Sequence, residues 1–518
     1  MVPEFVNEPL TDFSTPSHRQ AFESALRTVK TEFGRDWPLV IGGSPVTTSG
    51  WIESFNPCAR TQIVGRVARA GQGEAEQALA AAWTAFEDWS RWQPAERARV
   101  LFKAAALLRA RKHVFSATMV YEAGKTWPEA DADTAEAIDF LDYYAHEALR
   151  LAEPRALPRL PGEDNEMMYL PLGVGIIIPP WNFPLAITLG MTAAAIVTGN
   201  TAILKPASLT PIIAARAVDL LREAGAPDGV VNFLPGSGSE IGDFLVGHAR
   251  TRFISFTGSR EVGTHIYELA ARVQPGQRWL KRVVAEMGGK DAIIVDDTAD
   301  LELAADGIAT SAYGFQGQKC SAASRAIVLE PVYQDVLGKV ARRAEALRLG
   351  PAEDPTSQIS AVIDQSQYDK VLSYVEVGQR EGRLVVGGEP GATDGTDGWY
   401  IQPTVVADVP PEGRLAQEEI FGPLLSFIRA RDYGHALEIA NGTEYGLTGG
   451  VYSRDRRRLE QARAEFRVGN LYFNRKITGA MVGAQPFGGF DMSGTDSKAG
   501  GPDYLALFQQ AKVVVERF

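Results

Sequence analysis

The sequence predicts an α/β fold with two doubly wound α/β domains and a small additional β element. Short apolar runs typical of buried strands alternate with helical patterns along most of the chain, as in parallel sheets covered by helices on both faces. The alternation occurs in two separate sets, and 518 residues exceed the size at which a single hydrophobic core stops growing. Three further strand-like stretches lie outside both sets and predict the small element.

The first set of elements begins with helices and continues with strands. Amphipathic helical patterns rich in Ala and Leu occupy 74–92, 94–122 and 130–151. The strand-like runs that follow are each succeeded by a turn and a helical pattern, such as 211–224. They lie at 174–178, 201–204, 230–234 and 252–256.

The second set follows Glu286 and has the same character. Its strand-like runs lie at 291–295, 325–329, 384–387, 425–429 and 448–452. Outside both sets, 155–160 and 166–172 alternate polar and apolar residues around a Gly-Glu-Asp-Asn turn, which predicts a hairpin. Residues 512–516 form one more strand-like run near the C-terminus.

Bulk properties exclude several classes of protein. A net charge of -12 argues against nucleic acid as a partner, because phosphate binding needs a basic face. No uninterrupted apolar run approaches the ~18 residues of a membrane-spanning helix, so we expect no membrane association. Two cysteines and an N-terminus without a basic, then apolar, signal segment favour a reducing compartment, and we expect the cytoplasm.

Three polar residues at the ends of apolar runs predict covalent chemistry on a carbonyl group. Cys320 lies among small, polar and cationic neighbours, as a nucleophilic thiolate requires, although an isolated cysteine is more often an inert core residue. Glu286 follows an apolar run and precedes two glycines, where a general base would lie. Asn182 follows a strand halted by prolines and is a candidate oxyanion donor. Together they form a nucleophile, a base and an oxyanion donor.

Two glycine-rich segments are candidates for dinucleotide binding. The first, 236–242, has the spacing GxGxxxG, one residue longer than the usual fingerprint, and is a weak signal. The second contains Gly258 and Gly263. It follows the strand-like run 253–256 and lies at the start of a predicted helix, so Ser259 and the nearby backbone amides could bind a pyrophosphate. By contrast, Gly124-Lys125-Thr126 lacks the earlier glycine of a P-loop.

Taken together, these residues resemble the NAD(P)-dependent aldehyde dehydrogenase family, from about Trp37 to Phe518. The resemblance rests on seven motifs that occur in the family's order. They are Pro180-Trp181-Asn182-Phe183-Pro184, Leu204-Lys205-Pro206-Ala207, Phe256-Thr257-Gly258-Ser259 with Gly263, Glu286-Met287-Gly288-Gly289-Lys290, Gly317-Gln318-Lys319-Cys320, Glu418-Glu419-Ile420-Phe421-Gly422-Pro423 and Gln485-Pro486-Phe487-Gly488-Gly489.

The resemblance implies a mechanism. Cys320 attacks the aldehyde carbon, Asn182 and the Cys320 amide stabilise the alkoxide, hydride passes to NAD, and Glu286 activates the water that hydrolyses the thioester. Cys320-Ser321 and the loop 477–483 are most similar to members that oxidise L-glutamate γ-semialdehyde. The alternative is another ω-semialdehyde, such as succinate semialdehyde. No metal is implied.

The resemblance also implies the binding residues. Lys205 and Glu419 would hold the two sugars of NAD, and Ser208 replaces a glutamate that excludes NADP in many relatives, so NADP is expected to be tolerated. The cofactor residues would be Ile178, Pro179, Pro180, Trp181, Lys205, Ala207, Ser208, Gly238, Gly242, Thr257, Gly258, Ser259, Val262, Met287, Gly288, Glu419 and Phe421. The substrate residues would be Glu136, Phe183, Lys319, Ser321, Gly479, Ala480 and Phe487. Ser208 could equally be the N-cap of the following helix.

The same resemblance implies how the chain divides. Residues 1–154 and 173–286 would form the NAD-binding domain, and 287–485 the catalytic domain. Residues 155–172 and 486–518 would form an oligomerisation element, whose strands build the sheet that joins subunits. We therefore expect a homo-oligomer built from dimers.

Overall fold

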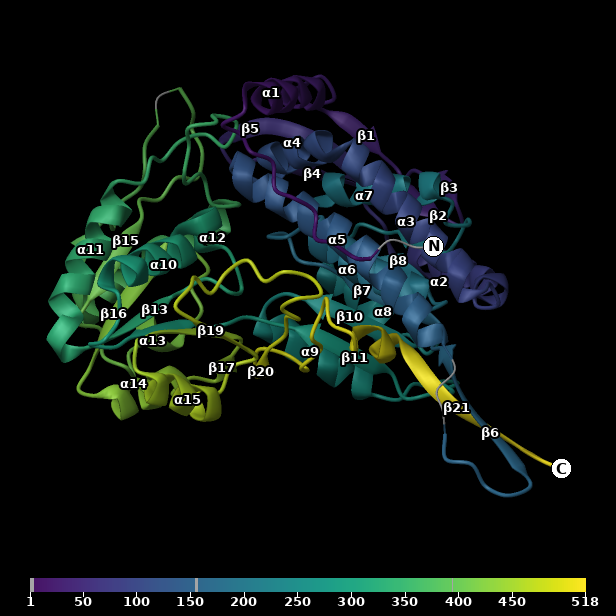
Figure 1. The fold of residues 1–518 in the computed structure, drawn as a ribbon. Coiled ribbons are helices and arrows are strands. Elements are labelled where there is room, and N and C mark those ends of the chain that lie inside the picture. Colours follow the sequence, from purple (N-terminus) through teal and green to yellow (C-terminus); the bar gives the residue numbers. More distant parts are fainter. Residues whose placement is uncertain (1–3, 154–156, 394) are drawn as a thin grey trace.

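The computed structural model describes residues 4–153, 157–393 and 395–518. Within these residues the core consists of two seven-stranded sheets, which lie in separate lobes (Figure 1). The first sheet has the order β11-β10-β7-β8-β9-β2-β3. Its strands are β2 (Leu39–Ile41), β3 (Ser44–Val46), β7 (Val174–Ile178), β8 (Thr201–Leu204), β9 (Val231–Phe233), β10 (Phe253–Thr257) and β11 (Arg282–Glu286). The five strands from β11 to β9 are parallel, and β2 and β3 are antiparallel.

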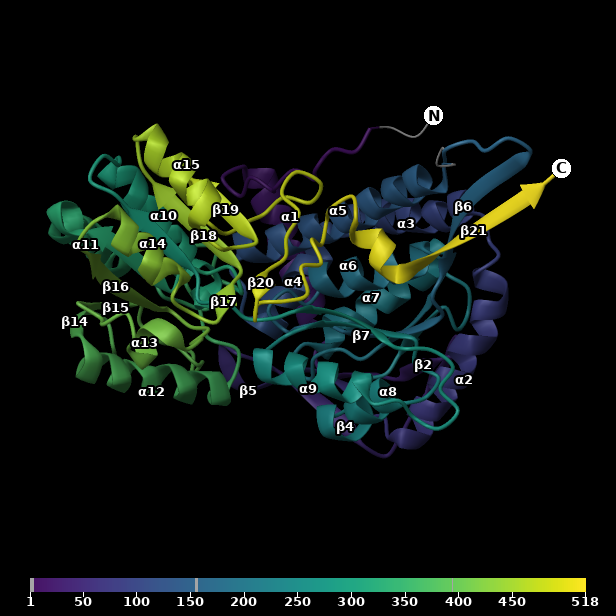
Figure 2. The same cartoon turned by 90° about the horizontal axis from the view of Figure 1, so that it is seen from below.

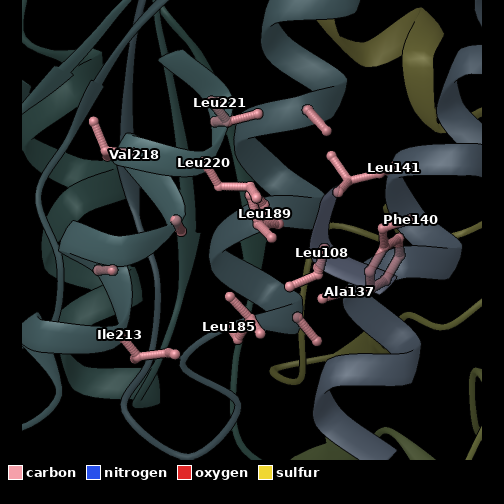
Figure 3. Packing of buried hydrophobic residues seen from close by; sticks show 14 of the residues in the cluster. Leu108, Ala137, Phe140, Leu141, Leu185, Leu189, Ile213, Val218, Leu220 and Leu221 are labelled. Atoms are coloured by element: carbon pink, nitrogen blue, oxygen red, sulfur yellow. The ribbon is translucent and has the colours of Figure 1, made fainter. Parts of the chain in front are cut away.

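Helices cover both faces of this first sheet because successive strand residues point to opposite sides. Ile176 and Ile203 pack with α2 (Gln72–Trp89), α8 (Asp243–Gly247) and α9 (Arg260–Ala271). Ile177 and Leu204 pack on the other side with the remaining helices. These are α1 (Pro16–Lys30), α3 (Pro94–Ala110), α4 (Lys112–Ala123), α5 (Trp127–Ala152), α6 (Ala186–Val197) and α7 (Pro211–Ala224). Figure 3 shows the contact of α3 and α5 with α6 and α7, which is made by buried apolar side chains such as Leu108, Leu141 and Leu189.

The second sheet has the order β14-β15-β16-β13-β12-β18-β19 and is parallel except for β14. Its strands are β12 (Ala292–Val295), β13 (Arg325–Leu329), β14 (Arg383–Val386), β15 (Thr404–Ala407), β16 (Leu424–Ala430), β18 (Thr448–Tyr452) and β19 (Asn470–Phe473). One face carries α10 (Leu301–Tyr313) and α11 (Tyr333–Glu345). The other carries α12 (Gln365–Glu381), α13 (Arg414–Gln417), α14 (Tyr433–Asn441) and α15 (Arg456–Glu465). The predicted class, with two doubly wound sheets, is confirmed.

A two-stranded ribbon projects from the first lobe (Figures 1 and 2). It pairs β6 (Glu163–Pro171) with the C-terminal strand β21 (Gln509–Arg517) in antiparallel register, so that Glu163 faces Arg517. The predicted hairpin of 155–160 with 166–172 is therefore wrong, although part of its first strand lies outside the described residues. Residues 157–160 form no strand. Proline lacks an N–H donor, and the prolines at 158 and 161 weaken this stretch as a partner.

Two other expectations need correction. The helix predicted over 94–122 is two helices, because Arg111 leaves the helical region between α3 and α4 and its side chain pairs with Glu223. Strands β15 and β19 of the second sheet were not predicted, and neither were β2 and β3 of the first. Small elements complete the described fold. They are β1 (Arg35–Trp37), β4 (Trp51–Asn56), β5 (Ala59–Ala68), β17 (Tyr445–Gly446), β20 (Phe490–Asp491), η1 (Gly238–Gly242), η2 (Gly314–Gly317), η3 (Glu330–Val332) and η4 (Tyr504–Phe508).

No helix of the described residues has both the length and the apolar composition needed to cross a lipid bilayer. The two cysteines are both free, with Cys58 buried and Cys320 partly accessible. They lie in different parts of the molecule: Cys58 follows β4, and Cys320 follows η2.

Candidate active site

The carboxyl ends of four parallel strands bring the predicted cofactor segments to one edge of the first sheet. β7, β8, β10 and β11 are neighbours, and Thr257 at the end of β10 pairs with Glu286 at the end of β11. Each strand runs directly into a predicted segment, at 178–182, 205–208, 257–259 and 286–288. In an open α/β sheet this edge is where ligands bind.

Cys320 lies in a tight turn that begins at the end of α10. Phe315, Gln316 and Gly317 have φ values of 50°, 57° and 68°. These angles lie in the left-handed region of backbone conformation, which residues other than glycine rarely adopt. The Gln316 amide holds this conformation by donating to the carbonyls of Gly124 and Ala361, at 3.2 and 2.7 Å. The turn is thus fixed to the first lobe as well as to the second.

The surroundings of Cys320 keep its thiol protonated. Burial raises the pKa of the Cys320 thiol, and the carboxyl groups of Asp291, Glu286 and Glu419 raise that pKa further. The thiol therefore has to give up its proton before the sulfur can act as a nucleophile.

Asn182 is joined to the turn that carries the nucleophile. It is buried, and its side-chain Nδ2 donates to the carbonyl of Gln318 at 3.0 Å, two residues before Cys320. The Gln318 side chain in turn accepts from the Ile363 amide at 2.9 Å. An amide nitrogen carries two N–H groups, so Asn182 keeps one donor for another acceptor.

Glu286 ends β11 and is held by a loop from the C-terminal part of the chain. Its carboxylate accepts from the Ser497 hydroxyl, from the Ser497 amide at 3.4 Å and from the Gly489 amide at 3.3 Å. Burial raises the pKa of Glu286 to about 7, while these hydrogen bonds and Lys498 act in the opposite direction. A carboxyl group with a pKa near 7 suits proton transfer at neutral pH.

One cavity of about 150 Å³ brings Cys320 and Glu286 together with all the predicted substrate residues. One face of α5 contributes Glu136 and Phe140, and η4 contributes Tyr504. The predicted substrate residues on its wall are Glu136, Phe183, Lys319, Ser321, Gly479, Ala480 and Phe487. Thr257 and Met287 also reach it, whereas Asn182 is not part of the wall.

Charged groups of both signs lie on the cavity wall. Lys319 Nζ is 2.6 Å from Glu129 Oε2, in an ion pair that is largely buried. Burial, followed by the repulsion of Asp133, raises the pKa of Glu136 to about 8. At neutral pH, Glu136 is therefore largely protonated until a cation approaches it.

Lys205 is a buried ammonium group at the cofactor edge. Burial lowers its pKa to about 8, and no described side chain forms an ion pair or hydrogen bond with it. A methyl group added at Gly242 would lie 3.5 Å from Lys205 Cε, so the first glycine-rich segment, with Gly238 at the start of η1, lies beside this lysine.

The residues that follow β8 and β10 present different groups. Ser208 is exposed and is not the N-cap of α7, because Thr210 occupies that position ahead of Pro211. Ser259 is the N-cap of α9 and accepts from the Val262 amide at 3.3 Å. Val262 itself is 48% exposed, an apolar side chain left open at the first turn of the helix.

Glu419 lies opposite the end of β11. Its carboxylate accepts from the Gly289 amide at 3.0 Å, and a methyl group added at Gly288 would lie 2.4 Å from its oxygens. A side chain at 288 would therefore displace the Glu419 carboxylate. Phe421, with φ of 64°, packs edge-to-face against Trp181, with ring centroids 5.5 Å apart. The remaining predicted residues, Ile178, Pro179, Pro180, Ala207 and Gly258, lie on the strand-end segments of this edge.

Sequence reasoning missed several groups that contact the site. Glu129 pairs with Lys319, and Asp133 pairs with the buried Lys125. Glu129, Asp133 and Glu136 lie four and three residues apart, and this acidic stripe on one helix face was a detectable signal. Ser497 had no such signal, because only the fold brings it to Glu286.

The chain is similar to known proteins over most or all of its length. The family model described as the aldehyde dehydrogenase family matches residues 46–514. The 1-pyrroline-5-carboxylate dehydrogenase of Geobacillus sp. (strain WCH70) is 59% identical over 518 residues, covering 100% of both chains. A crystal structure of 1-pyrroline-5-carboxylate dehydrogenase from Thermus with bound NAD is 56% identical, with a TM-score of 0.98 and 100% of both chains covered.

A longer protein contains a similar structure as a part. Proline utilization A from Bdellovibrio bacteriovorus, inactivated by N-propargylglycine, is 44% identical with a TM-score of 0.97. The match covers 99% of this chain and 53% of that one. The family match over most of the sequence and the full-length similarity to the Geobacillus and Thermus proteins lead to one conclusion: this chain belongs to the aldehyde dehydrogenase family.

Proposed function

We propose that this protein oxidises L-glutamate γ-semialdehyde, the open-chain form of 1-pyrroline-5-carboxylate, to L-glutamate with NAD, a step of proline catabolism. One observation carries the proposal. Cys320 and Glu286 share a single cavity with Ser321, Gly479 and Ala480, which can bind an anion, and with a carboxyl group that can bind a cation. The full-length similarity to 1-pyrroline-5-carboxylate dehydrogenases supports the same substrate.

In the proposed reaction, the Cys320 thiol gives its proton to solvent, and its sulfur attacks the aldehyde carbon. The free N–H of Asn182 and the Cys320 amide stabilise the alkoxide that forms. After hydride loss the acyl group remains on sulfur as a thioester. Glu286, with a pKa of about 7, removes a proton from water as the water oxygen attacks this thioester, and the product leaves as a carboxylate.

The residues at the carboxyl ends of β7, β8, β10 and β11 fit a dinucleotide. Lys205 offers a buried ammonium without a partner among the described residues, and α9 offers an N-terminus next to Ser259. Glu419 offers a carboxylate across from Gly288, suited to a sugar hydroxyl. Bound NAD would supply the hydride acceptor. Ser208 is exposed and uncharged, so nothing at this position repels a 2′-phosphate, and we expect NADP to be tolerated.

The substrate would be held at both ends. Its α-carboxylate would accept from Ser321 and from the amides of Gly479 and Ala480, where Gly479 has a φ of 72°. Its ammonium would lie near Glu136, whose ionisation it would favour. Phe183 and Phe487 would enclose the aliphatic middle. Lys319 is already neutralised by Glu129, which leaves it as a secondary partner for the carboxylate.

We also propose that the chain divides into two domains and an oligomerisation element. The two sheets support an NAD-binding domain of 1–154 and 173–286 and a catalytic domain of 287–485. Val513, Val515 and Phe518 are exposed on or just after β21, which supports 155–172 and 486–518 as a subunit contact in a homo-oligomer. A cytoplasmic location remains part of the proposal.

A substrate comparison tests the proposed function. We expect kcat/KM for glutamate γ-semialdehyde to exceed that for succinate semialdehyde and for simple aliphatic aldehydes, because a buried site for two charged groups penalises a substrate that lacks one. Ala480→Leu should reduce the preference by crowding the carboxylate site. If succinate semialdehyde is the better substrate in the wild type, or if Ala480→Leu leaves the ratio unchanged, another ω-semialdehyde takes its place.

A further inference from the structure

The loop of residues 493–498 wraps around the end of β11. Met287 donates to the Ser493 carbonyl at 2.8 Å, and the Thr495 amide donates to the Ala285 carbonyl at 2.8 Å. The Thr495 hydroxyl accepts from the Ala285 amide at 3.0 Å. These contacts fix the loop to the backbone on both sides of Glu286, so its side chains have a defined position relative to the carboxylate.

Ser497 is held rigidly within this loop. The residues before and after it, Asp496 and Lys498, have φ values of 51° and 45°, so the backbone turns through the left-handed region on both sides. The backbone conformation at Lys498 is held by its own side chain, whose Nζ donates to the carbonyls of Gly469 and Gly488 at 2.9 and 2.6 Å. Ser497 itself is 3% exposed, so no solvent competes for its hydroxyl.

The two donors of Ser497 converge on one atom. Both its hydroxyl and its amide donate to Glu286 Oε1, and the Gly489 amide donates to Oε2. Glycines complete the space: a methyl group at Gly488 or Gly494 would lie 3.0 or 3.2 Å from the same carboxylate. The arrangement is a small, closed cradle that fits one carboxylate in one orientation.

We propose that Ser497 is a positioning residue for the general base, which it holds at the cavity wall in its ionised form through the hydroxyl and the amide. This proposal rests on the proposed function. It assigns Ser497 to the second half of the reaction, in which the thioester is hydrolysed. There, water loses a proton to Glu286, the water oxygen bonds to the thioester carbon, and the carbon–sulfur bond breaks to return Cys320 as a thiolate.

The surroundings of the carboxylate make the effect of Ser497 measurable. The other titratable groups that face Glu286 are Lys498 on the same loop, Cys320 and Tyr504. Burial raises the pKa of Glu286, and the Ser497 hydroxyl is the largest influence that lowers it. Because a hydrogen bond to the charged form favours that form, removing the hydroxyl moves the pKa of Glu286 upward.

The experiment measures the NADH burst and the pH dependence of kcat in Ser497→Ala. We expect the acid limb of kcat to move to higher pH by about one unit and turnover at pH 7 to fall roughly fivefold, since hydrogen bonds to ionised groups are the strong ones. The rate of the burst should stay unchanged, because hydride transfer precedes the step that needs the base. Ser497→Thr keeps the hydroxyl and should restore the wild-type limb.

Thr495→Val is the matched control, because it removes a hydroxyl from the same loop that bonds the Ala285 backbone and not the carboxylate. It should keep the wild-type acid limb. An unchanged limb in Ser497→Ala, or an equal shift in Thr495→Val, overturns the role of Ser497. Glu286→Gln, measured in parallel, distinguishes failure of the Ser497 proposal from failure of the proposed mechanism. If that variant also turns over normally, Glu286 is not the general base.

Discussion

Lys125 and Asp133 form an ion pair that no water reaches. Both side chains are fully buried, and Lys125 Nζ is 3.0 Å from Asp133 Oδ2. The ammonium also lies 3.9 Å from the ring centre of Phe183 and 4.3 Å from that of Phe315. The other Asp133 oxygen accepts from the Ala186 amide at 2.7 Å. The pair therefore connects the segment after Asn182 with the turn before Cys320.

Removing one partner should be costly because it leaves an unpaired charge in the interior. Breaking a buried pair costs about 3–5 kcal/mol, and in a domain of ordinary size each kcal/mol lowers Tm by about 2–4 °C. We therefore expect Lys125→Met to lower Tm by roughly 6–20 °C. The exposed pair of Lys30 and Glu353, 3.6 Å apart, provides a matched control, because Lys30→Met should change stability by less than about 1 kcal/mol.

The pH dependence identifies which charge is left behind. Burial already raises the pKa of Asp133 and lowers that of Lys125. In Lys125→Met the folded protein binds more protons than the unfolded chain, so its stability relative to wild type falls as pH rises above the ordinary carboxyl pKa of about 4. In Asp133→Asn the unfolded chain binds more protons, so stability rises with pH up to the ordinary lysine pKa of about 10.

The assay is thermal unfolding of both single variants and the double variant, from pH 5 to pH 9. Opposite slopes in the single variants, and a slope close to wild type in the double variant, are expected. Slopes of the same sign, or a loss in Lys125→Met as small as in Lys30→Met, would refute the reasoning. Because a protein with two sheet domains does not have to unfold in one step, the shift in Tm is the quantity compared.

Three further predictions concern the reaction itself. Cys320→Ala should abolish dehydrogenase turnover while NAD still binds, as measured by calorimetry, whereas Cys58→Ala should keep most activity; turnover in the first variant would contradict the assignment. Glu286→Gln should give an NADH burst followed by slow turnover in stopped flow, and wild-type steady-state turnover would remove Glu286 from its role. Wild type should prefer NAD over NADP only modestly, and Ser208→Glu should widen the ratio of kcat/KM by repelling the 2′-phosphate; a wild type inactive with NADP would show that another residue excludes it.

The sequence predicted the parallel strands well because they are buried on both faces. Runs such as 174–178 and 201–204 are apolar at every position or nearly so, and they coincide with β7 and β8. β6 was paired wrongly because a strand in a projecting two-stranded ribbon carries no local mark of its partner. Its partner is β21, more than 300 residues away along the chain.

Glu286 could be predicted from its place at the end of a strand-like run, and Cys320 from its small, polar and cationic neighbours. The seven substrate residues, which meet both of them in one cavity, were predicted from the resemblance to the family. Ser497 and Lys125 could not be predicted in the same way. Serine and lysine are common on surfaces, and only the fold shows that these two are buried against a carboxylate.

The C-terminal segment has a consequence for synthesis on the ribosome. It completes the first lobe: Asn200 donates to the Phe508 carbonyl at 2.9 Å, Tyr504 stacks on Tyr144, and Arg282 at the start of β11 donates to the Leu507 carbonyl at 2.6 Å. At about 5–20 residues per second, translation from the end of β11 to β21 takes roughly 10–45 s. During that interval the nascent first lobe lacks its last partner and exposes apolar surface. Domains usually finish folding in the order of their synthesis, whereas here the first lobe to emerge is the last to be completed.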